Sequence, residues 1–309
     1  MTFAATSALA RTEATLRLLE LQVNRRLDGL LQGDHLGLVP APGTEPGEGR
    51  EYVVGDDVRR IDWNLTARTN VTHVRDTIAD RELETWIVVD RSASLDFGTA
   101  QCEKRDLALV AVGAVGFLTL RSANRVGAVV LAGEHSFHQP ARSGRNALLA
   151  LLHRIDGLPR APAGESNKEQ LDAAVARVAA VARKRGLVVI VSDFLATDEW
   201  VRPMRALTAR HDVLAVEVID PRELELPDVG VLELIDTETG RRIEVQTASV
   251  KLRQRYAEAA AEQRAATTRA LRGVGAEHMV LRTDRDWILD IVQYVGNRRR
   301  RRAGRAVTP

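Results

Sequence analysis

Residues 86–98 read WIVVDRSASLDFG, an apolar run that ends in an acid, two alternate serines and a glycine. The run has no polar residue from Trp86 to Val89, whereas a strand with one solvent-facing side alternates apolar and polar residues. We therefore expect a strand that is buried on both faces, as in a parallel sheet covered by helices. Its polar end at Asp90 then lies where the strand leaves the core.

From residue 84 onward, short runs rich in Val and Ile alternate with segments of helical periodicity. This alternation is typical of βαβ units and a parallel sheet. We predict strands at residues 85–90, 126–132, 134–138, 187–192, 213–219 and 278–282. We predict helices at residues 103–121, 144–155, 168–184, 198–210, 247–272 and 286–295. The expected fold class is an α/β, doubly wound, mostly parallel sheet.

Two connections are too short to hold a crossover helix. Ala132-Gly133 joins the two strands within residues 126–138, so we expect one edge strand of the main sheet to be antiparallel. Residues 229–246 carry two β-rich runs on either side of Thr239-Gly240, and this pattern predicts a second hairpin.

The first 83 residues differ in pattern from the rest of the chain. Residues 11–31 place leucines at helical spacing among Arg and Glu, which predicts an amphipathic helix. Residues 52–75 mix turn residues with short β-rich runs. We expect an N-terminal helix and a small β insertion in residues 1–83, and the main α/β domain in residues 84–296.

The chain ends in a basic segment, residues 297–309. Five consecutive arginines occupy residues 298–302, and such a block repels itself in solution. We predict a disordered, solvated tail.

Composition restricts the class of protein. The formal net charge is only +2 although 28% of the residues are charged, so the overall field does not favour nucleic acid. Cys102 is the only cysteine, which excludes an intrachain disulfide and predicts a cytoplasmic, reducing location. The longest apolar run, residues 110–120, has about half of the roughly 20 residues that a membrane span needs. The sequence also lacks a G-x-x-x-x-G-K-[ST] string for ATP.

Two acids end predicted strands: Asp90 ends WIVVD and Asp193 ends VIVSD. Ligands of doubly wound sheets bind at the carboxyl ends of strands, near the point where the strand order reverses. Ser92 and Ser94 follow Asp90 at alternate positions, so an extended loop would point both hydroxyls the same way. Carboxylates and hydroxyls suit Mg²⁺ or Mn²⁺ rather than zinc. The alternative is that Asp90 and the serines cap the following helix.

A further hydroxyl is expected from the loop that precedes the predicted helix 168–184. Ser166 is the available residue, and we include it among the candidate metal ligands. Ser166 and Glu169 also form an S-x-x-E capping box, which explains the serine without a metal.

The D-x-S-x-S string at Asp90, with the later Asp193, resembles the metal-ion-dependent adhesion site of von Willebrand factor A-like domains. The longer string GREYVVGDDVRRIDWNLTAR, followed by THVRD and VVDRSASLDFG, resembles the bacterial domain-of-unknown-function family 58. The resemblance covers nearly the whole chain and implies a von Willebrand A-like fold with metal ligands at Asp90, Ser92, Ser94 and Asp193. The threonine that such sites take from the middle loop has no counterpart in GESNKEQL, residues 164–171.

The resemblance implies a binding partner rather than a reaction. Members of this family are expected to act with AAA+ ATPases of the MoxR type in maturing or remodelling a client protein. In adhesion-type sites a carboxylate of the partner completes the coordination of the metal. We therefore expect a non-enzymatic scaffold. The sequence has no membrane helices before the signature string and resembles the shorter, soluble members.

The signature string itself supplies the candidate partner-binding residues Asp57, Arg59, Asp62, Trp63 and Arg68. Arginine pairs bidentately with carboxylates, so these charges could simply hold the insertion rigidly on the main domain. The functional alternative is a partner surface around the tryptophan, because Trp and Arg are common interface anchors.

Two other classes of function stay open. The first is a Mg²⁺-dependent hydrolase or phosphotransferase with Asp90 as its catalytic acid and nucleophile. Phosphatases of the haloacid-dehalogenase type have a second acid two residues later, where this chain has Ser92. The second is nucleic-acid binding through the arginine tail, although contacts of this kind carry little specificity.

Overall fold

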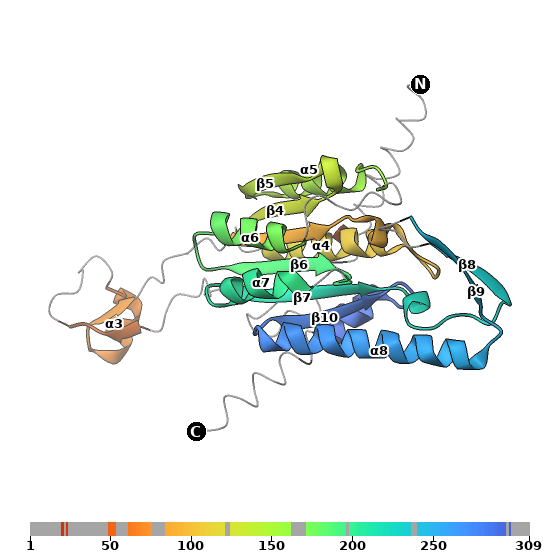
Figure 1. The fold of residues 1–309 in the computed structure, drawn as a ribbon. Coiled ribbons are helices and arrows are strands. Elements are labelled where there is room, and N and C mark those ends of the chain that lie inside the picture. The colour runs from red at the N-terminus through yellow and green to blue at the C-terminus, as the bar shows by residue number, and fades with distance from the viewer. Residues whose placement is uncertain are drawn as a thin grey trace.

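The computed structural model describes residues 20, 21, 23, 49–53, 61–75, 84–120, 124–161, 171–195, 198–235, 240–294 and 297. Most of these residues form a six-stranded sheet with helices on both faces (Figure 1). In the described part of the chain, no helix combines the length and the apolar character needed to cross a membrane.

The main sheet has the strand order β10-β7-β6-β3-β4-β5. Its strands are β3 (Glu84–Asp90), β4 (Arg125–Leu131), β5 (Phe137–Arg142), β6 (Leu187–Ser192), β7 (Asp212–Ile219) and β10 (Glu277–Arg282). β5 pairs antiparallel with β4 at one edge, and all other neighbouring pairs are parallel. Counted along the chain, the order is third, second, first, fourth, fifth, sixth, which is that of a doubly wound fold. The predicted α/β fold class is confirmed.

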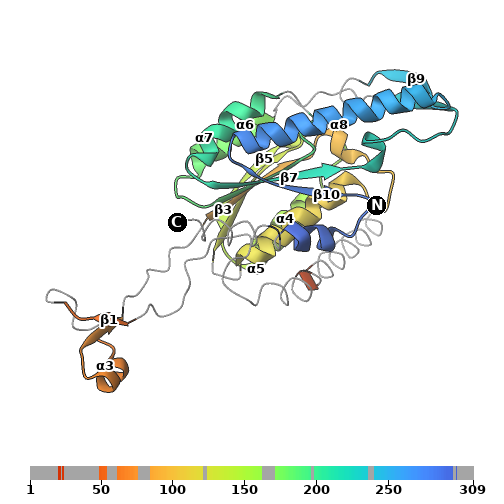
Figure 2. The same ribbon diagram turned by 90° about the horizontal axis from the view of Figure 1, so that it is seen from below.

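Helices cover both faces of this sheet. Figure 2 shows α4 and α5 on one face and α6, α7 and α8 on the other. Their bounds are α4 (Lys104–Leu120), α5 (Arg145–Asp156), α6 (Leu171–Val181), α7 (Val201–Thr208) and α8 (Val250–Gly273). A further helical segment, residues 287–294, follows β10.

The sequence of β3 explains its central position. Every residue from Thr85 to Asp90 is buried. Ile87 and Val89 belong to the apolar core under α4 and α5, whereas Trp86 and Val88 belong to the core on the opposite face. The apolar run therefore lacks alternation because both sides of the strand are covered, as predicted.

Both predicted hairpins are present, but the edge strand of the first is displaced. The strand predicted at 134–138 is wrong in both bounds, because Gly133–His135 forms a 3-10 turn and β5 runs from Phe137 to Arg142. Gly133 takes a positive φ of 57°, which a glycine adopts without strain. The second hairpin consists of β8 (Val231–Ile235) and β9 (Arg242–Gln246).

The N-terminal insertion contains a small antiparallel sheet of β1 (Gly49–Glu51) and β2 (His73–Arg75). It also contains helix α3 (Trp63–Thr69), which the predicted strand-and-turn pattern did not include. Figure 1 shows this lobe in orange, outside the six-stranded sheet. Of the predicted N-terminal helix, only Glu20, Leu21 and Val23 are described; Val23 is fully buried in the core under α4. The arginine tail lies outside the described residues.

Two glycines test how tightly the sheet is packed. A Cβ at Gly186, just before β6, would lie 2.0 Å from the carbonyl oxygen of Glu84. That oxygen belongs to the backbone of a central strand and cannot move away cheaply. We expect Gly186→Ala to lower the free energy of unfolding by about 1–3 kcal/mol in chemical denaturation.

The matched control is Gly273→Ala at the end of α8, where an added Cβ meets nothing within 4 Å. This variant should be neutral or slightly more stable, because alanine restricts the unfolded chain. Equal destabilisation by both substitutions would contradict the close approach of β6 and β3.

Candidate functional site

The two predicted strand-end acids meet at the carboxyl edge of the sheet. Asp90 is the last residue of β3, and Asp193 follows the last residue of β6. These strands are neighbours, and the chain leaves β3 toward β4 on the other side, so the strand order reverses here. This is the switch point at which doubly wound sheets bind ligands.

Asp90 is buried and is held by neutral donors. Its Oδ1 accepts from the amide of Ser92 at 2.9 Å, and its Oδ2 accepts from the Ser192 hydroxyl at 2.7 Å. No ion pair within the described residues includes this carboxyl. Burial, and then the charge of nearby Asp193, raises the pKa of Asp90.

The two serines after Asp90 lie close together, but not in the extended loop that was expected. Ala93–Asp96 forms a 3-10 helix that contains Ser94, with Ser92 directly before it. The hydroxyl oxygens of Ser92 and Ser94 are nevertheless 3.0 Å apart. The side chain of Ser92 makes no capping bond to this short helix, which argues against a purely capping role.

Lys104 is the feature of the site that the sequence did not predict. It is the first residue of α4 and is fully buried. Its Nζ donates to Asp193 Oδ2 at 2.8 Å and to Glu223 Oε1 at 2.5 Å. Burial opposes its charge, but the two carboxylates outweigh that effect and raise the pKa of Lys104. One ammonium thus joins α4 to the loops after β6 and β7.

A third strand-end acid, Asp220, directly follows β7 at the same edge of the sheet. It is fully buried and accepts from the Thr99 amide and hydroxyl, the Thr283 hydroxyl and the Arg222 amide, at 2.6 to 2.9 Å. These donors lower its pKa against the effect of burial. Asp220 and Glu223 also form a capping box around a short 3-10 helix. Asp220 is therefore satisfied by hydrogen bonds, without a cation.

The chain turns sharply after Asp193. Phe194 has a left-handed φ of 55°, which is unusual for a residue with a Cβ. Its ring packs against Trp200 with ring centroids 5.4 Å apart. Asp193 Oδ1 accepts from the Leu195 amide at 3.2 Å, and the side chain of Leu195 is 42% exposed. This turn places an apolar side chain in solvent beside the acids.

The donors fit a divalent ion in part. Mg²⁺ binds oxygen at about 2.0–2.1 Å in an octahedron, so two adjacent ligands lie about 2.9 Å apart. The Ser92 and Ser94 hydroxyls, 3.0 Å apart, meet this requirement, and Asp90 supplies a carboxylate beside them. Asp193 differs, because one of its oxygens is bound by Lys104. The described residues contain no group of three His, Cys, Asp or Glu side chains suited to a metal, and Ser166 lies outside them.

The signature residues that the structure describes lie in the small lobe. Asp62 is the N-cap of α3 and accepts from the amides of Asn64 and Leu65. Trp63, the first residue of that helix, is 71% exposed, and Arg68 is exposed in its last turn. Asp62 thus has a structural role, while Trp63 has the exposure of a contact residue. Asp57 and Arg59 lie outside the described residues.

Two of the site residues that the sequence analysis did not predict, Lys104 and Asp220, could have been recognised from the local sequence. Lys104 begins a helix, where the helix dipole disfavours a cation, so a buried anion nearby could have been expected. Asp220 follows an apolar strand just as Asp90 and Asp193 do. Glu223, Thr99 and Thr283 had no local signal, because their contacts join distant parts of the chain.

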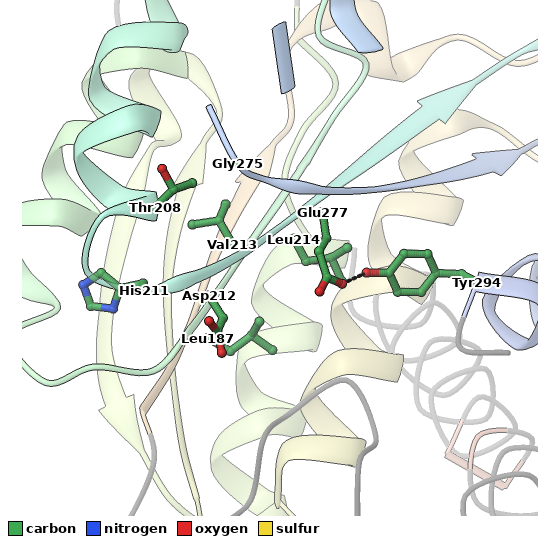
Figure 3. Close-up of a pocket in the computed structure, with 9 residues that line it drawn as sticks. All are labelled: Leu187, Thr208, His211, Asp212, Val213, Leu214, Gly275, Glu277 and Tyr294. Carbon is green, nitrogen blue, oxygen red and sulfur yellow. Dashed lines mark hydrogen bonds between the residues drawn. The ribbon is translucent and has the colours of Figure 1, made fainter. Parts of the chain in front are cut away.

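A cavity of about 120 Å³ lies at the opposite, amino edge of the sheet (Figure 3). It is lined by the first residues of β6, β7 and β10 and by Tyr294. Tyr294 donates a hydrogen bond to Glu277, and Thr208 donates to the carbonyl of Val274 at 2.6 Å. Burial lowers the pKa of the lining His211. Tyr294 and Thr208 thus have internal partners, and the carboxyl edge, where the strand-end acids lie at the switch point, is the candidate site.

Several solved bacterial structures match part of this chain at low sequence identity. An aerotolerance-related membrane protein from Bacteroides fragilis matches 70% of this chain and 99% of its own, with 15% identity and a TM-score of 0.43. The conserved hypothetical protein BatB from Bacteroides thetaiotaomicron matches 71% and 99%, with 16% identity and a TM-score of 0.43. A von Willebrand factor type A structure from Catenulispora acidiphila matches 48% and 35%, with 12% identity and a TM-score of 0.34.

Sequence relatives are much closer. The uncharacterized proteins Rv1480 of Mycobacterium tuberculosis and Mb1516 of Mycobacterium bovis are each 54% identical over 289 residues, which cover 93% of this chain and 90% of theirs. A family model described as protein of unknown function DUF58 matches residues 48–266. With the family match across most of its length, this chain belongs to the DUF58 family.

Proposed function

We propose that this protein is a non-enzymatic scaffold whose carboxyl edge binds a protein partner. The observation that carries the proposal is Asp90, a buried carboxyl at the switch point with hydroxyl and amide partners but no cation within the described residues. A buried acid without a counter-charge destabilises a fold, so its presence is better explained by binding than by packing.

The surroundings of Asp90 favour a protein ligand. The paired hydroxyls of Ser92 and Ser94 offer polar contacts, and exposed Leu195 offers an apolar contact near Asp193. Such a mixture of a few directed polar groups with an apolar neighbour is common in protein interfaces.

The partner we propose is a MoxR-type AAA+ ATPase, acting with this scaffold on a client protein in the cytoplasm. The family resemblance of the signature string supports this partner. If Mg²⁺ or Mn²⁺ takes part, Ser92, Ser94 and Asp90 would hold it, and the ion would supply a Lewis acid for a partner carboxylate. Trp63 is the proposed second contact, because an exposed tryptophan is a frequent interface anchor.

The cost of Asp90 to stability is testable. A folded-state pKa raised above its ordinary value of 3.8 means that the folded state holds the proton more tightly than the unfolded state. The contribution of Asp90 to wild-type stability should therefore fall as the pH rises from about 3.8 through its folded-state pKa. We expect Asp90→Asn to unfold at a higher temperature than wild type at neutral pH. The difference should shrink below pH 3.8, where Asp90 is neutral in both states. A less stable variant at neutral pH would contradict this reading.

The binding role of the edge is tested with the MoxR-type ATPase of the same organism. We expect Asp90→Asn and Ser94→Ala each to weaken association at least about tenfold, a loss of about 1.4 kcal/mol, in biolayer interferometry with Mg²⁺ and with EDTA. Leu289→Ala, which truncates an exposed residue of the helical segment 287–294, is the control. Wild-type protein that does not bind the ATPase would refute this partner. Unchanged binding by both edge variants would refute the proposed surface.

The role of the small lobe is tested separately. Because Trp63 is 71% exposed, Trp63→Ala should leave the melting temperature unchanged. We expect the same variant to weaken ATPase binding by at least about 1 kcal/mol, as truncation of an interface tryptophan commonly does. A fall in melting temperature without a change in binding would assign Trp63 to packing instead.

A further inference from the structure

We propose that Lys104 is a built-in counter-cation of the carboxyl edge, which takes the place of a divalent ion at Asp193. The ammonium group lies within hydrogen-bond distance of two carboxylates from different loops, Asp193 at 2.8 Å and Glu223 at 2.5 Å. Its side chain is fully buried, and Asp193 is 5% exposed. Lys104 is thus a positioning residue that acts through Asp193.

The geometry separates the edge into two halves. On one side, Asp90 and the paired hydroxyls of Ser92 and Ser94 have only neutral partners. On the other side, Asp193 and Glu223 share the charge of Lys104. An ion at the serines would therefore be held without the Lys104-bound oxygen of Asp193. Because an ammonium and a divalent ion repel each other at short range, the lysine also limits how strongly the edge attracts metal.

Burying the charge of Lys104 would destabilise the fold if the ammonium were not paired with the two carboxylates. A fully buried lysine is rare, and at the first position of a helix its charge is disfavoured by the helix dipole. The loop before α4 is fixed independently: the Lys104 amide donates to the Phe97 carbonyl at 2.8 Å, and Thr99 is bound to Asp220. The backbone therefore presents the ammonium to Asp193 at a defined position.

The test removes the ammonium and asks whether Mg²⁺ replaces it. Lys104→Met retains an unbranched side chain but leaves two acids without a counter-charge. We expect its melting temperature to fall by roughly 10 °C in EDTA. Millimolar MgCl₂ should restore part of this loss, whereas NaCl of the same ionic strength should not. The melting temperature of the wild-type protein should respond less to Mg²⁺ than that of Lys104→Met does.

Lys184→Met is the matched control, because Lys184 is exposed and precedes β6, whereas Asp193 follows the opposite end of that strand. It should show neither the loss nor the response to Mg²⁺. The double variant Lys104→Met with Asp193→Asn should melt above Lys104→Met alone, because it removes a buried charge that has lost its partner. If the lysine only fills space, neither MgCl₂ nor the added Asp193→Asn substitution should raise the melting temperature of Lys104→Met.

If Lys104→Met does not fold, a calorimetric titration of Mg²⁺ into wild type and Asp193→Asn tests the same inference. Identical titrations, with or without measurable binding, support the inference, because Asp193 then contributes nothing to a metal site. Binding in wild type that is lost in Asp193→Asn would overturn it, as would equal stabilisation of wild type and Lys104→Met by Mg²⁺. These measurements need no partner, so their outcome is independent of ATPase binding.

Discussion

The ammonium group of Lys104 is the contact on which the arrangement of the carboxyl edge depends. It joins the start of α4 to Asp193 after β6 and to Glu223 after β7, so one side chain fixes the relative positions of three segments. The charge is retained in a fully buried place because two carboxylates surround it. A buried cation of this kind is stable only while both partners stay in place.

The three strand-end acids are balanced by different means. Asp220 accepts from four neutral donors, Asp193 from the Lys104 ammonium and the Leu195 amide, and Asp90 from the Ser192 hydroxyl and the Ser92 amide. Of the three acids, Asp90 has the least compensation for its charge, with two neutral donors and no cation among the described residues. The least satisfied acid lies between β4 and β6, where the strand order reverses. This acid, which has no cation partner among the described residues, thus lies at the switch point of the sheet.

The fold was largely predictable because its signals are local. The unbroken apolar run of β3 indicated burial on both faces, and the strands fall within a few residues of their predicted bounds except at β5. The strand-end position of Asp90 and Asp193 was predictable for the same reason. Lys104 was not, because its contact with Asp193 spans 89 residues and no local pattern encodes such a pairing. Helix α3 was missed because it buries no residue and so shows little apolar periodicity.

Phe194 combines a strained backbone conformation with a buried side chain. A left-handed conformation costs a residue with a Cβ about 1–2 kcal/mol, a strain that glycine would relieve. The same substitution would delete a buried ring that packs on Trp200, a loss on the order of 3–5 kcal/mol. The backbone favours the smallest residue at this position, and the core favours one of the largest. Replacing Phe194 by glycine would therefore lose more in the core than it would gain in the backbone, so the packing of the ring holds the strained turn that exposes Leu195.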